Sequence, residues 1–247
     1  MRNRDLFQSV VAAMAANIAV LLVATTPARA DDRTDADAAF KAEEYEKAEK
    51  IYMRLAEAGP RDALIYRNLA ICYNQNHRSG AFIDMAEDNY RRALKIDDKD
   101  PLTHYRLGQH LRSYVHGTDA IDEFRATARL DPRHVEARYW LARLLQSHNL
   151  DAGGESERLY KEVIQLDPGH VEAHYFLAVH YHNAGRTAEA LPLFECGGKL
   201  KRRGEGMDPA QLEEYRLQIL EDLENRRKEK QERIELQKRL EQERKHP

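Results

Sequence analysis

The chain has 247 residues, of which 42% are hydrophobic and 33% are charged, while glycine and proline are scarce at 12 and 8 residues. This balance is typical of a soluble, ordered, helix-rich protein, and it excludes a mostly disordered chain and a mostly membrane-embedded one. The formal net charge of -3 is too close to balance to make nucleic acid the expected partner.

The first 30 residues have the pattern of a secretory signal peptide. A basic start, MRNR, precedes an apolar run over about 9–25, and the small-residue triplet ARA ends at Ala30. We expect cleavage after Ala30, export to a bacterial periplasm, and a mature chain that does not span the membrane. Because the apolar run is long for a signal, an uncleaved N-terminal anchor is the alternative.

Five related segments follow, and each has an aromatic residue four places after a small one. The pairs are Ala48 and Tyr52, Ala86 and Tyr90, Ala120 and Phe124, Ser156 and Tyr160, and Ala190 and Phe194. The last four segments each follow another helical segment, in which a leucine precedes Ala or Gly. These leucines, 38, 34 and 36 residues apart, are Leu69, Leu107, Leu141 and Leu177. A period of this length predicts repeated helical hairpins.

These landmarks, together with prolines at positions 60, 132 and 168, resemble the tetratricopeptide repeat family, whose unit is a 34-residue helix-turn-helix. The resemblance covers about residues 34–200. It implies an all-α, right-handed α-solenoid of about five units, in which the first helices line a concave groove and the second helices form the back. The units are 31–60, which is the loosest match, then 63–98, 101–134, 135–168 and 171–204.

Two of the leucine spacings exceed the family period, which implies insertions. They fall between the two helices of the second and fourth units, at about 74–84 and 147–157. Both lie at the same edge of the predicted solenoid, and per-repeat insertions often cluster on a functional face. Tolerated variation in loop length is the simpler interpretation.

Residues 208–246 predict a helix that caps the last repeat and continues as a charged tail. Asp208 and Pro209 form a helix start. Beyond Leu223 the apolar stripe ends, and Glu stands four places before Lys or Arg in several pairs, as in a solvated helix. Coiled-coil pairing of this helix with itself or with a partner is the alternative. The stripe that suits capping consists of Leu212, Tyr215, Ile219 and Leu223.

After export, the two cysteines of the chain would be in an oxidising compartment, where disulfides can form. Cys72 and Cys196 lie three repeats apart, too far for a disulfide, so we expect both to be small core residues. A covalent dimer through either is the alternative.

The resemblance also implies which side chains face the groove. Arginine binds carboxylates through two parallel hydrogen bonds, and tyrosine offers rigid apolar area with a polar tip, so we expect an extended peptide with acidic or carboxylate groups. The candidate peptide-binding residues are Arg67, Asn74, Tyr105, Gln109, Arg112, Tyr139, Arg143, Gln146, Tyr175 and His182.

A variant of this groove occurs in some cytosolic co-chaperones of the family, which hold a C-terminal carboxylate in a clamp of Lys, Asn and Arg side chains. Asn68 and Arg106 match two of those places. Arg67, Ile71 and Leu102 depart from the other three. The clamp is therefore incomplete.

The sequence contains no recognised catalytic, cofactor or metal motif, so we predict no catalytic residue, no cofactor and no metal. The histidine-rich stretch HYFLAVHYH, 174–182, has no histidine pair at the i, i+4 spacing of a helical metal site. His104 and His174 hold equivalent places in two repeats and are expected to pack, whereas His182 faces the groove.

Together these features predict a non-enzymatic protein-interaction scaffold of the cell envelope that binds an extended, acidic or carboxylate-bearing peptide or partner segment. The alternative is a structural or oligomerising component of an envelope assembly or export complex, which acts through self-association of the C-terminal charged helix.

Overall fold

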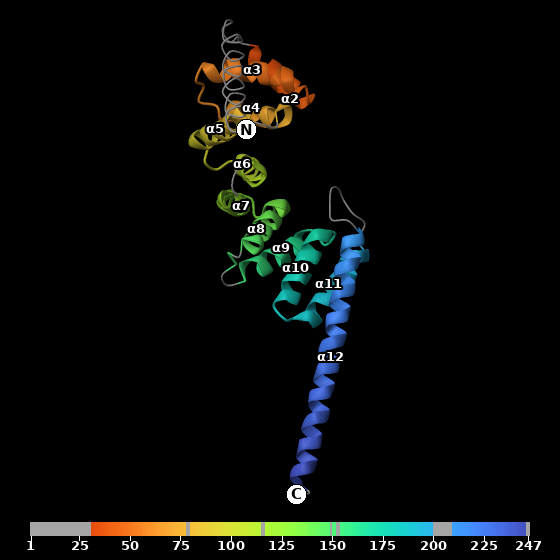
Figure 1. The fold of residues 1–247 in the computed structure, drawn as a ribbon. Helices are drawn as coiled ribbons and strands as arrows, with labels where there is room; N and C mark the ends of the chain where they lie inside the picture. Colours follow the sequence, from red (N-terminus) through yellow and green to blue (C-terminus); the bar gives the residue numbers. More distant parts are fainter. Residues whose placement is uncertain are drawn as a thin grey trace, which may run out of the picture. The chain divides into compact units, whose positions relative to one another are not determined.

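The computed structural model describes residues 31–77, 80–114, 117–148, 150–151, 154–199 and 209–245. The predicted signal peptide lies outside these residues. Every regular element in the described ranges is an α-helix (Figure 1). None of the helices found there is both long enough and apolar enough to cross a bilayer.

The helices follow one another as hairpins, and the predicted all-helical fold of helix-turn-helix units is confirmed. The paired helices have between 10 and 16 residues, and the last described helix has 37. The pairs are α2 (Asp32–Lys41) and α3 (Tyr45–Glu57), α4 (Ala63–Asn76) and α5 (Ala81–Ile96), α6 (Pro101–Tyr114) and α7 (Gly117–Leu130), α8 (Val135–Ser147) and α9 (Glu155–Leu166), and α10 (Val171–Asn183) and α11 (Thr187–Lys199), followed by α12 (Pro209–Lys245).

The chain divides into two compact units, Met1–Ala137 and Arg138–Pro247. Helices α2 to α7 belong to the first unit, and α8 from Arg138 onward belongs to the second unit with α9 to α12.

The core of each hairpin is the small residue and the aromatic ring that the sequence repeats. The small residues are completely buried, and the rings are at most 5% exposed. Close packing also explains Gly108, which follows Leu107 on the facing helix α6: a Cβ added there would come within 3.0 Å of the Phe124 ring on α7. Two helices can approach this closely only where one of them has almost no side chain at the crossing.

Two histidines begin the first helices of the fourth and fifth repeats. His134 Nδ1 accepts a hydrogen bond from the backbone N–H of Ala137, and His170 Nδ1 accepts one from Ala173, at 3.2 Å in both cases. Each imidazole therefore satisfies a backbone donor that the helix itself leaves unpaired. The same rings pack on a tyrosine of the preceding repeat, with centroid distances of 4.4 Å to Tyr105 for the first and 4.7 Å to Tyr139 for the second.

Described residues within both predicted insertion segments contact neighbouring helices. In the second repeat, the His77 ring stacks on Phe82 at 3.7 Å, and His77 Nε2 lies 3.2 Å from Glu49 Oε1 on α3. In the fourth repeat, Asp151 accepts hydrogen bonds from the backbone N–H and the hydroxyl of Ser156 at the start of α9. These residues therefore have structural roles at the hairpin edge.

The two cysteines differ in environment. Cys72 is completely buried on α4, as predicted, and burial raises the pKa of its thiol to about 12. Cys196 is exposed on α11, so the prediction that it is a core residue was wrong. Near the end of α11 the side chain faces solvent, although the sequence around it is apolar.

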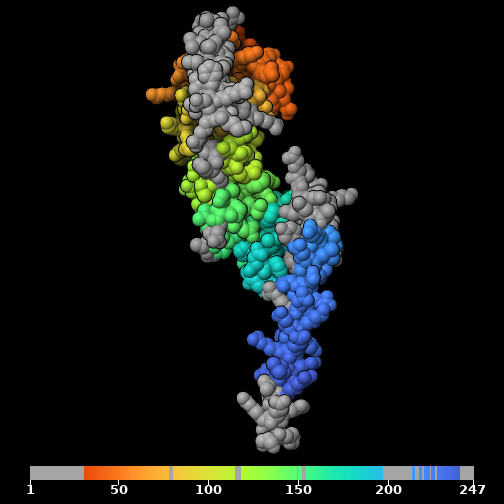
Figure 2. Space-filling model, in the orientation of Figure 1, coloured from red at the N-terminus to blue at the C-terminus, as the bar shows by residue number. Residues whose placement is uncertain are grey.

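Helix α12 packs against α11, and His182 Nδ1 on α10 lies 3.8 Å from Asp222 Oδ2 on α12. The described side chains from Glu224 to Arg239 are exposed. Figure 2 shows this part of the helix, in blue, with its side chains reaching into solvent. Described side chains on every face of this part of the helix are exposed, as expected for a solvated helix.

Candidate peptide-binding site

A hollow of about 140 Å³ lies on the first-helix face of the first unit, between α4 and α6. We call it the α4–α6 hollow. Most of its lining side chains are polar, and two of them, Asn74 and Gln109, belong to the predicted groove set. The lining consists of Ile71, Asn74, Gln75, Tyr90, Arg106, Gln109, His110, Ser113 and Tyr114.

Asn74 links one end of the hollow to the hairpin core. Its amide Nδ2 donates to the Tyr90 hydroxyl at 3.2 Å, and its Oδ1 accepts from His110 Nδ1 at 2.9 Å. His110 is 2% exposed, and burial lowers the pKa of its imidazole. The ring is therefore neutral at physiological pH, and it contributes no charge to the hollow.

Arg106 is the cation of the hollow. Its Nη1 donates to Gln109 Oε1 at 3.1 Å, and Gln109 Nε2 in turn donates to the Tyr105 hydroxyl at 3.0 Å. Burial raises the pKa of Tyr105 to about 12, so this hydroxyl stays protonated. No carboxylate lines the hollow, and within the described residues Arg106 forms no ion pair. A half-buried guanidinium among neutral polar side chains favours the binding of a carboxylate from a ligand.

The other predicted residues of the first unit are placed differently. Arg67 Nη1 donates to Asp100 Oδ2 at 2.8 Å, and the two side chains are 16% and 17% exposed. Burial opposes ionisation of Asp100, but hydrogen bonds from Thr103 and Arg67 hold its pKa below the ordinary value. Arg67 is thus occupied by an internal ion pair, whereas Arg112 is exposed on α6.

In the second unit, two predicted tyrosines are part of the core. Tyr139 is 6% exposed and Tyr175 is 3% exposed. The ring of Tyr139 packs on His170 and that of Tyr175 packs on Phe194, with centroid distances of 4.7 and 5.6 Å. Most of their ring area is consequently covered by the protein itself, and their role in binding stays a prediction.

The remaining predicted residues of the second unit also have internal contacts. The guanidinium carbon of Arg143 lies 3.6 Å from the centre of the Phe176 ring, a cation–π arrangement. Gln146 Oε1 accepts a hydrogen bond from the Tyr160 hydroxyl at 3.0 Å. His182 faces α12, through its approach to Asp222.

The two histidines expected to pack do so. His174 is 5% exposed, and its Nε2 donates to the Pro168 carbonyl at 3.2 Å. His104 Nδ1 donates to Glu123 Oε2 at 2.7 Å, and the hydrogen bond to Glu123 raises the pKa of His104. In the part of the chain that the structure describes, no three His, Cys, Asp or Glu side chains gather closely enough to hold a metal ion.

The position of Asn68 is a further argument against the co-chaperone clamp. This residue is 8% exposed, and its amide donates to the Tyr52 hydroxyl at 3.0 Å, so it is part of the hairpin core. Arg106, the second matching place, instead lies in the α4–α6 hollow. The predicted groove set omitted Arg106, although its match to the clamp pattern was a usable signal. Also omitted were Gln75, His110, Ser113 and Tyr114.

Comparison with known proteins agrees with this architecture. Family models described as tetratricopeptide repeat match residues 34–101 and 116–152 in one case and 151–195 in the other. No curated protein sequence matches the chain closely enough to add a relative. Tetratricopeptide repeats support a role as a protein–protein interaction scaffold, and proteins built from them are generally non-enzymatic.

Solved structures share the fold at low sequence identity. A crystal structure of MamA is 18% identical, with a TM-score of 0.58 over 66% of this chain and 91% of that chain. A second MamA structure, AMB-1, is 21% identical, with a TM-score of 0.59 over 68% and 96%. YrrB, described as a TPR protein with an unusual peptide-binding site, is 22% identical, with a TM-score of 0.58 over 66% and 80%. The helical hairpins of this chain therefore belong to the tetratricopeptide repeat family.

Proposed function

We propose that this protein is a non-enzymatic interaction scaffold of the cell envelope, and that it binds an extended, carboxylate-bearing peptide in the α4–α6 hollow. The observation that supports the proposal most directly is Arg106, a half-buried cation surrounded by neutral polar side chains with no carboxylate among them. A bound carboxylate would supply the anionic partner that the protein does not provide.

The other lining groups suit the main chain of a peptide. Gln75 presents a side-chain amide, which can both donate to and accept from backbone groups. The Asn74 amide already binds Tyr90 and His110, and it keeps one N–H and one oxygen lone pair for a ligand. Tyr114 is 39% exposed and offers ring area to an apolar side chain. This combination of one charge, several amides and one aromatic surface is typical of a site that fixes a short extended segment rather than a small molecule.

Binding to defined peptides tests this function. The probes are short labelled peptides of one common sequence with Glu, Gln or Lys at two positions, each with a free or an amidated C-terminus, and the readout is fluorescence anisotropy. The full chain should prefer the Glu series or the free C-terminus. Because a hydrogen bond to a charged group contributes about 1.5–3 kcal/mol, R106Q should weaken that binding by roughly 10- to 150-fold.

Arg91 on α5 provides the matched control. It is exposed, and among the residues that the structure describes it pairs only with Glu87, so R91Q removes the same charge outside the hollow. Equal affinities of R106Q and R91Q for the acidic peptide, or a wild-type chain that does not distinguish Glu from Lys, would contradict the proposed site. R112E with R143E tests whether these two predicted arginines contribute, and unchanged binding would exclude them.

The envelope assignment depends on the N-terminal signal pattern. Expression of the full sequence in a bacterium, followed by fractionation and mass spectrometry, tests it. We expect a periplasmic protein whose first residue is Asp31. A product that retains residues 1–30 and sediments with membranes would instead support the anchor, and a cytoplasmic product would refute export.

A further inference from the structure

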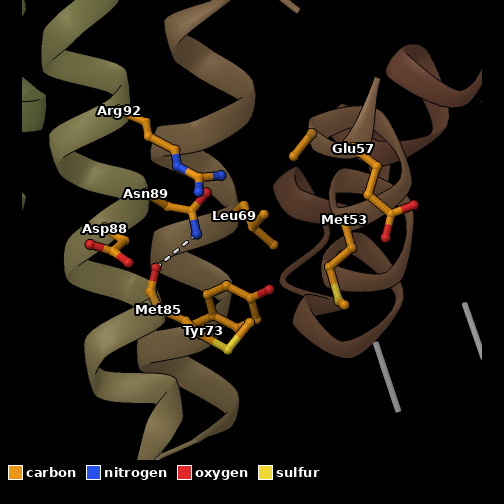
Figure 3. Close-up of a pocket in the computed structure, with 9 residues that line it drawn as sticks. Met53, Glu57, Leu69, Tyr73, Met85, Asp88, Asn89 and Arg92 are labelled. Carbon is orange, nitrogen blue, oxygen red and sulfur yellow. Dashed lines mark hydrogen bonds between the residues drawn. The ribbon is translucent and has the colours of Figure 1, made fainter. Parts of the chain in front are cut away.

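A second hollow, of about 200 Å³, lies on the opposite type of helix face, between the second helices α3 and α5, with α4 at its base. We call it the α3–α5 pocket. Figure 3 shows side chains from all three helices converging on it. It shares no lining residue with the α4–α6 hollow. Its lining consists of Met53, Ala56, Glu57, Leu69, Tyr73, Met85, Asp88, Asn89 and Arg92.

The pocket is apolar inside and charged at its rim. Met53, Leu69 and Met85 supply thioether and aliphatic surface, and thioethers adapt to irregular apolar partners. At the rim, the carboxylates of Glu57 and Asp88 and the guanidinium of Arg92 are exposed, which leaves one net negative charge. The volume is smaller than that of a typical small-molecule site, so the pocket fits a single apolar side chain with a cation beside it.

Asn89 gives independent evidence that something binds there. This residue is 7% exposed, and its Nδ2 donates to the Met85 carbonyl at 2.7 Å, as the dashed line in Figure 3 shows. Its Oδ1 is buried and has no hydrogen-bond partner within the described residues. Buried acceptors in proteins are almost always satisfied. An occupant of the pocket should therefore bring a hydrogen-bond donor.

The exposed part of α12 has one face with matching chemistry, centred on Ile234, which is 45% exposed. At 100° per residue, the residues three, four and seven places away lie within about 60° of Ile234. The nearest are basic or carry a side-chain amide, and all of them are exposed: Arg227, Lys230, Gln231, Gln237 and Lys238. Glu241 is the one acidic residue of this face in the sequence, at its C-terminal end.

We propose that this basic face of α12 docks into the α3–α5 pocket of a second copy of the chain. Ile234 fills the apolar interior, and Lys230 and Lys238, one turn away on each side, face Glu57 and Asp88 at the rim. The amide of Gln231 or Gln237 donates to Asn89 Oδ1. This is helix-in-groove recognition, with one apolar anchor and flanking charges that set the partner and its orientation.

Two observations on the helix favour this occupant. Within the described residues Lys230 and Lys238 form no ion pair, whereas Lys228 on the same helix pairs with Glu224. Lys230 has no carboxylate three or four places away in the sequence. Lys238 has Glu235 and Glu241 three places away, but it forms no ion pair within the described residues. The pocket lining holds two carboxylates and one cation, Arg92, so the basic face would meet a rim with an excess of negative charge.

Sedimentation velocity of the full chain at low and high salt gives the first test. We expect the mean mass to rise with protein concentration at low salt, and association to weaken at high salt because surface charges are screened. I234E should weaken association at least tenfold. A single monomer mass at all concentrations, or association that is unchanged in I234E, would overturn the proposal.

Charge exchange between two variants gives the decisive test. E57K/D88K makes the rim basic, and K230E/K238E makes the helix face acidic, so neither variant should self-associate. An equimolar mixture should associate as well as the wild-type chain, because each rim then meets a helix of opposite charge. A mixture that stays monomeric would overturn the proposal.

The matched control is E46K/D84K. Both carboxylates are exposed on the same two helices, α3 and α5, but neither lines the pocket. The charge change is identical, so we expect this variant to self-associate like the wild-type chain, without a complementary partner. Loss of association in this control would show a general charge effect and would overturn the assigned pocket. Peptide binding to the α4–α6 hollow should be the same in all of these variants.

Discussion

Replacing Glu157 by Gln should destabilise the second unit. Glu157 lies in the first turn of α9 and accepts hydrogen bonds from Lys161 Nζ at 2.6 Å, the Tyr181 hydroxyl at 3.1 Å and Arg186 Nη1 at 2.8 Å. The hydrogen bond from Lys161, with those from Tyr181 and Arg186, lowers the pKa of Glu157 to about 2, against an opposing effect of burial. One carboxylate therefore joins α9 to the end of α10 and to the turn before α11.

The size of the effect follows from the pKa. The change from 4.5 to about 2 corresponds to about 3 kcal/mol of stability at neutral pH, at 1.36 kcal/mol per pH unit. Solvent reduces this figure, because the side chains of Lys161 and Arg186 are 50% and 39% exposed. We therefore expect E157Q to lower the free energy of unfolding by about 1–2 kcal/mol at pH 7.

Urea unfolding followed by circular dichroism at pH 7, 5 and 3 measures this loss. A carboxylate with a lowered pKa stabilises the fold above its unfolded pKa of about 4.5, and the contribution disappears as the pH falls toward about 2. The difference between wild-type and E157Q should therefore shrink by more than half at pH 3. The control E189Q removes one exposed partner of Arg186 and should have a much smaller effect. A loss that is equal at pH 7 and pH 3 would refute the reasoning.

Three further substitutions test the core and the histidines by the same measurement. G108V should cost about 1–3 kcal/mol, because its side chain would collide with Phe124; an unchanged midpoint would contradict this packing. Y52F should cost about 1–2 kcal/mol, because the Tyr52 hydroxyl bonds Asp37 and Asn68. H104Q should lose stability below pH 6.5 but not at high pH, because the raised pKa of His104 stabilises only the protonated form; a pH-independent loss would contradict the Glu123 contact.

The fold was predictable from the sequence because its determinants recur locally. Ala48 and Tyr52, or Ala86 and Tyr90, sit four places apart on one helix, and the requirement for a small residue beside a ring is the same in every hairpin. Landmarks of this kind need no knowledge of distant contacts. The helix that begins at Pro209 was visible for the same reason, since the signals for its start are adjacent in the sequence.

The candidate site was only partly predictable, because side-chain partners come from other repeats. Arg67 finds Asp100 33 residues away, and nothing near Arg67 in the sequence indicates that its charge is already paired. Tyr139 is covered by His170, which lies at the start of the next repeat. Arg106 could be noticed in the sequence, because it matches the co-chaperone clamp pattern. Its availability to bind a carboxylate depends on the lack of carboxylates in the lining of the α4–α6 hollow, which only the packed structure shows.

The histidine caps at the starts of α8 and α10 have a consequence for length variation along the chain. The stretch between Tyr139 and His170 contains the predicted insertion of the fourth repeat, whereas the stretch between Tyr105 and His134 contains none. The ring centroids are nevertheless at similar distances in the two pairs, 4.7 Å in the first and 4.4 Å in the second. Extra residues at the far end of a hairpin thus leave the junction between repeats intact. A reporter peptide grafted into the turn between α8 and α9 should therefore leave the contact of Tyr139 with His170 in place, as long as Asp151, which binds Ser156 and approaches His180 of the next repeat, is retained.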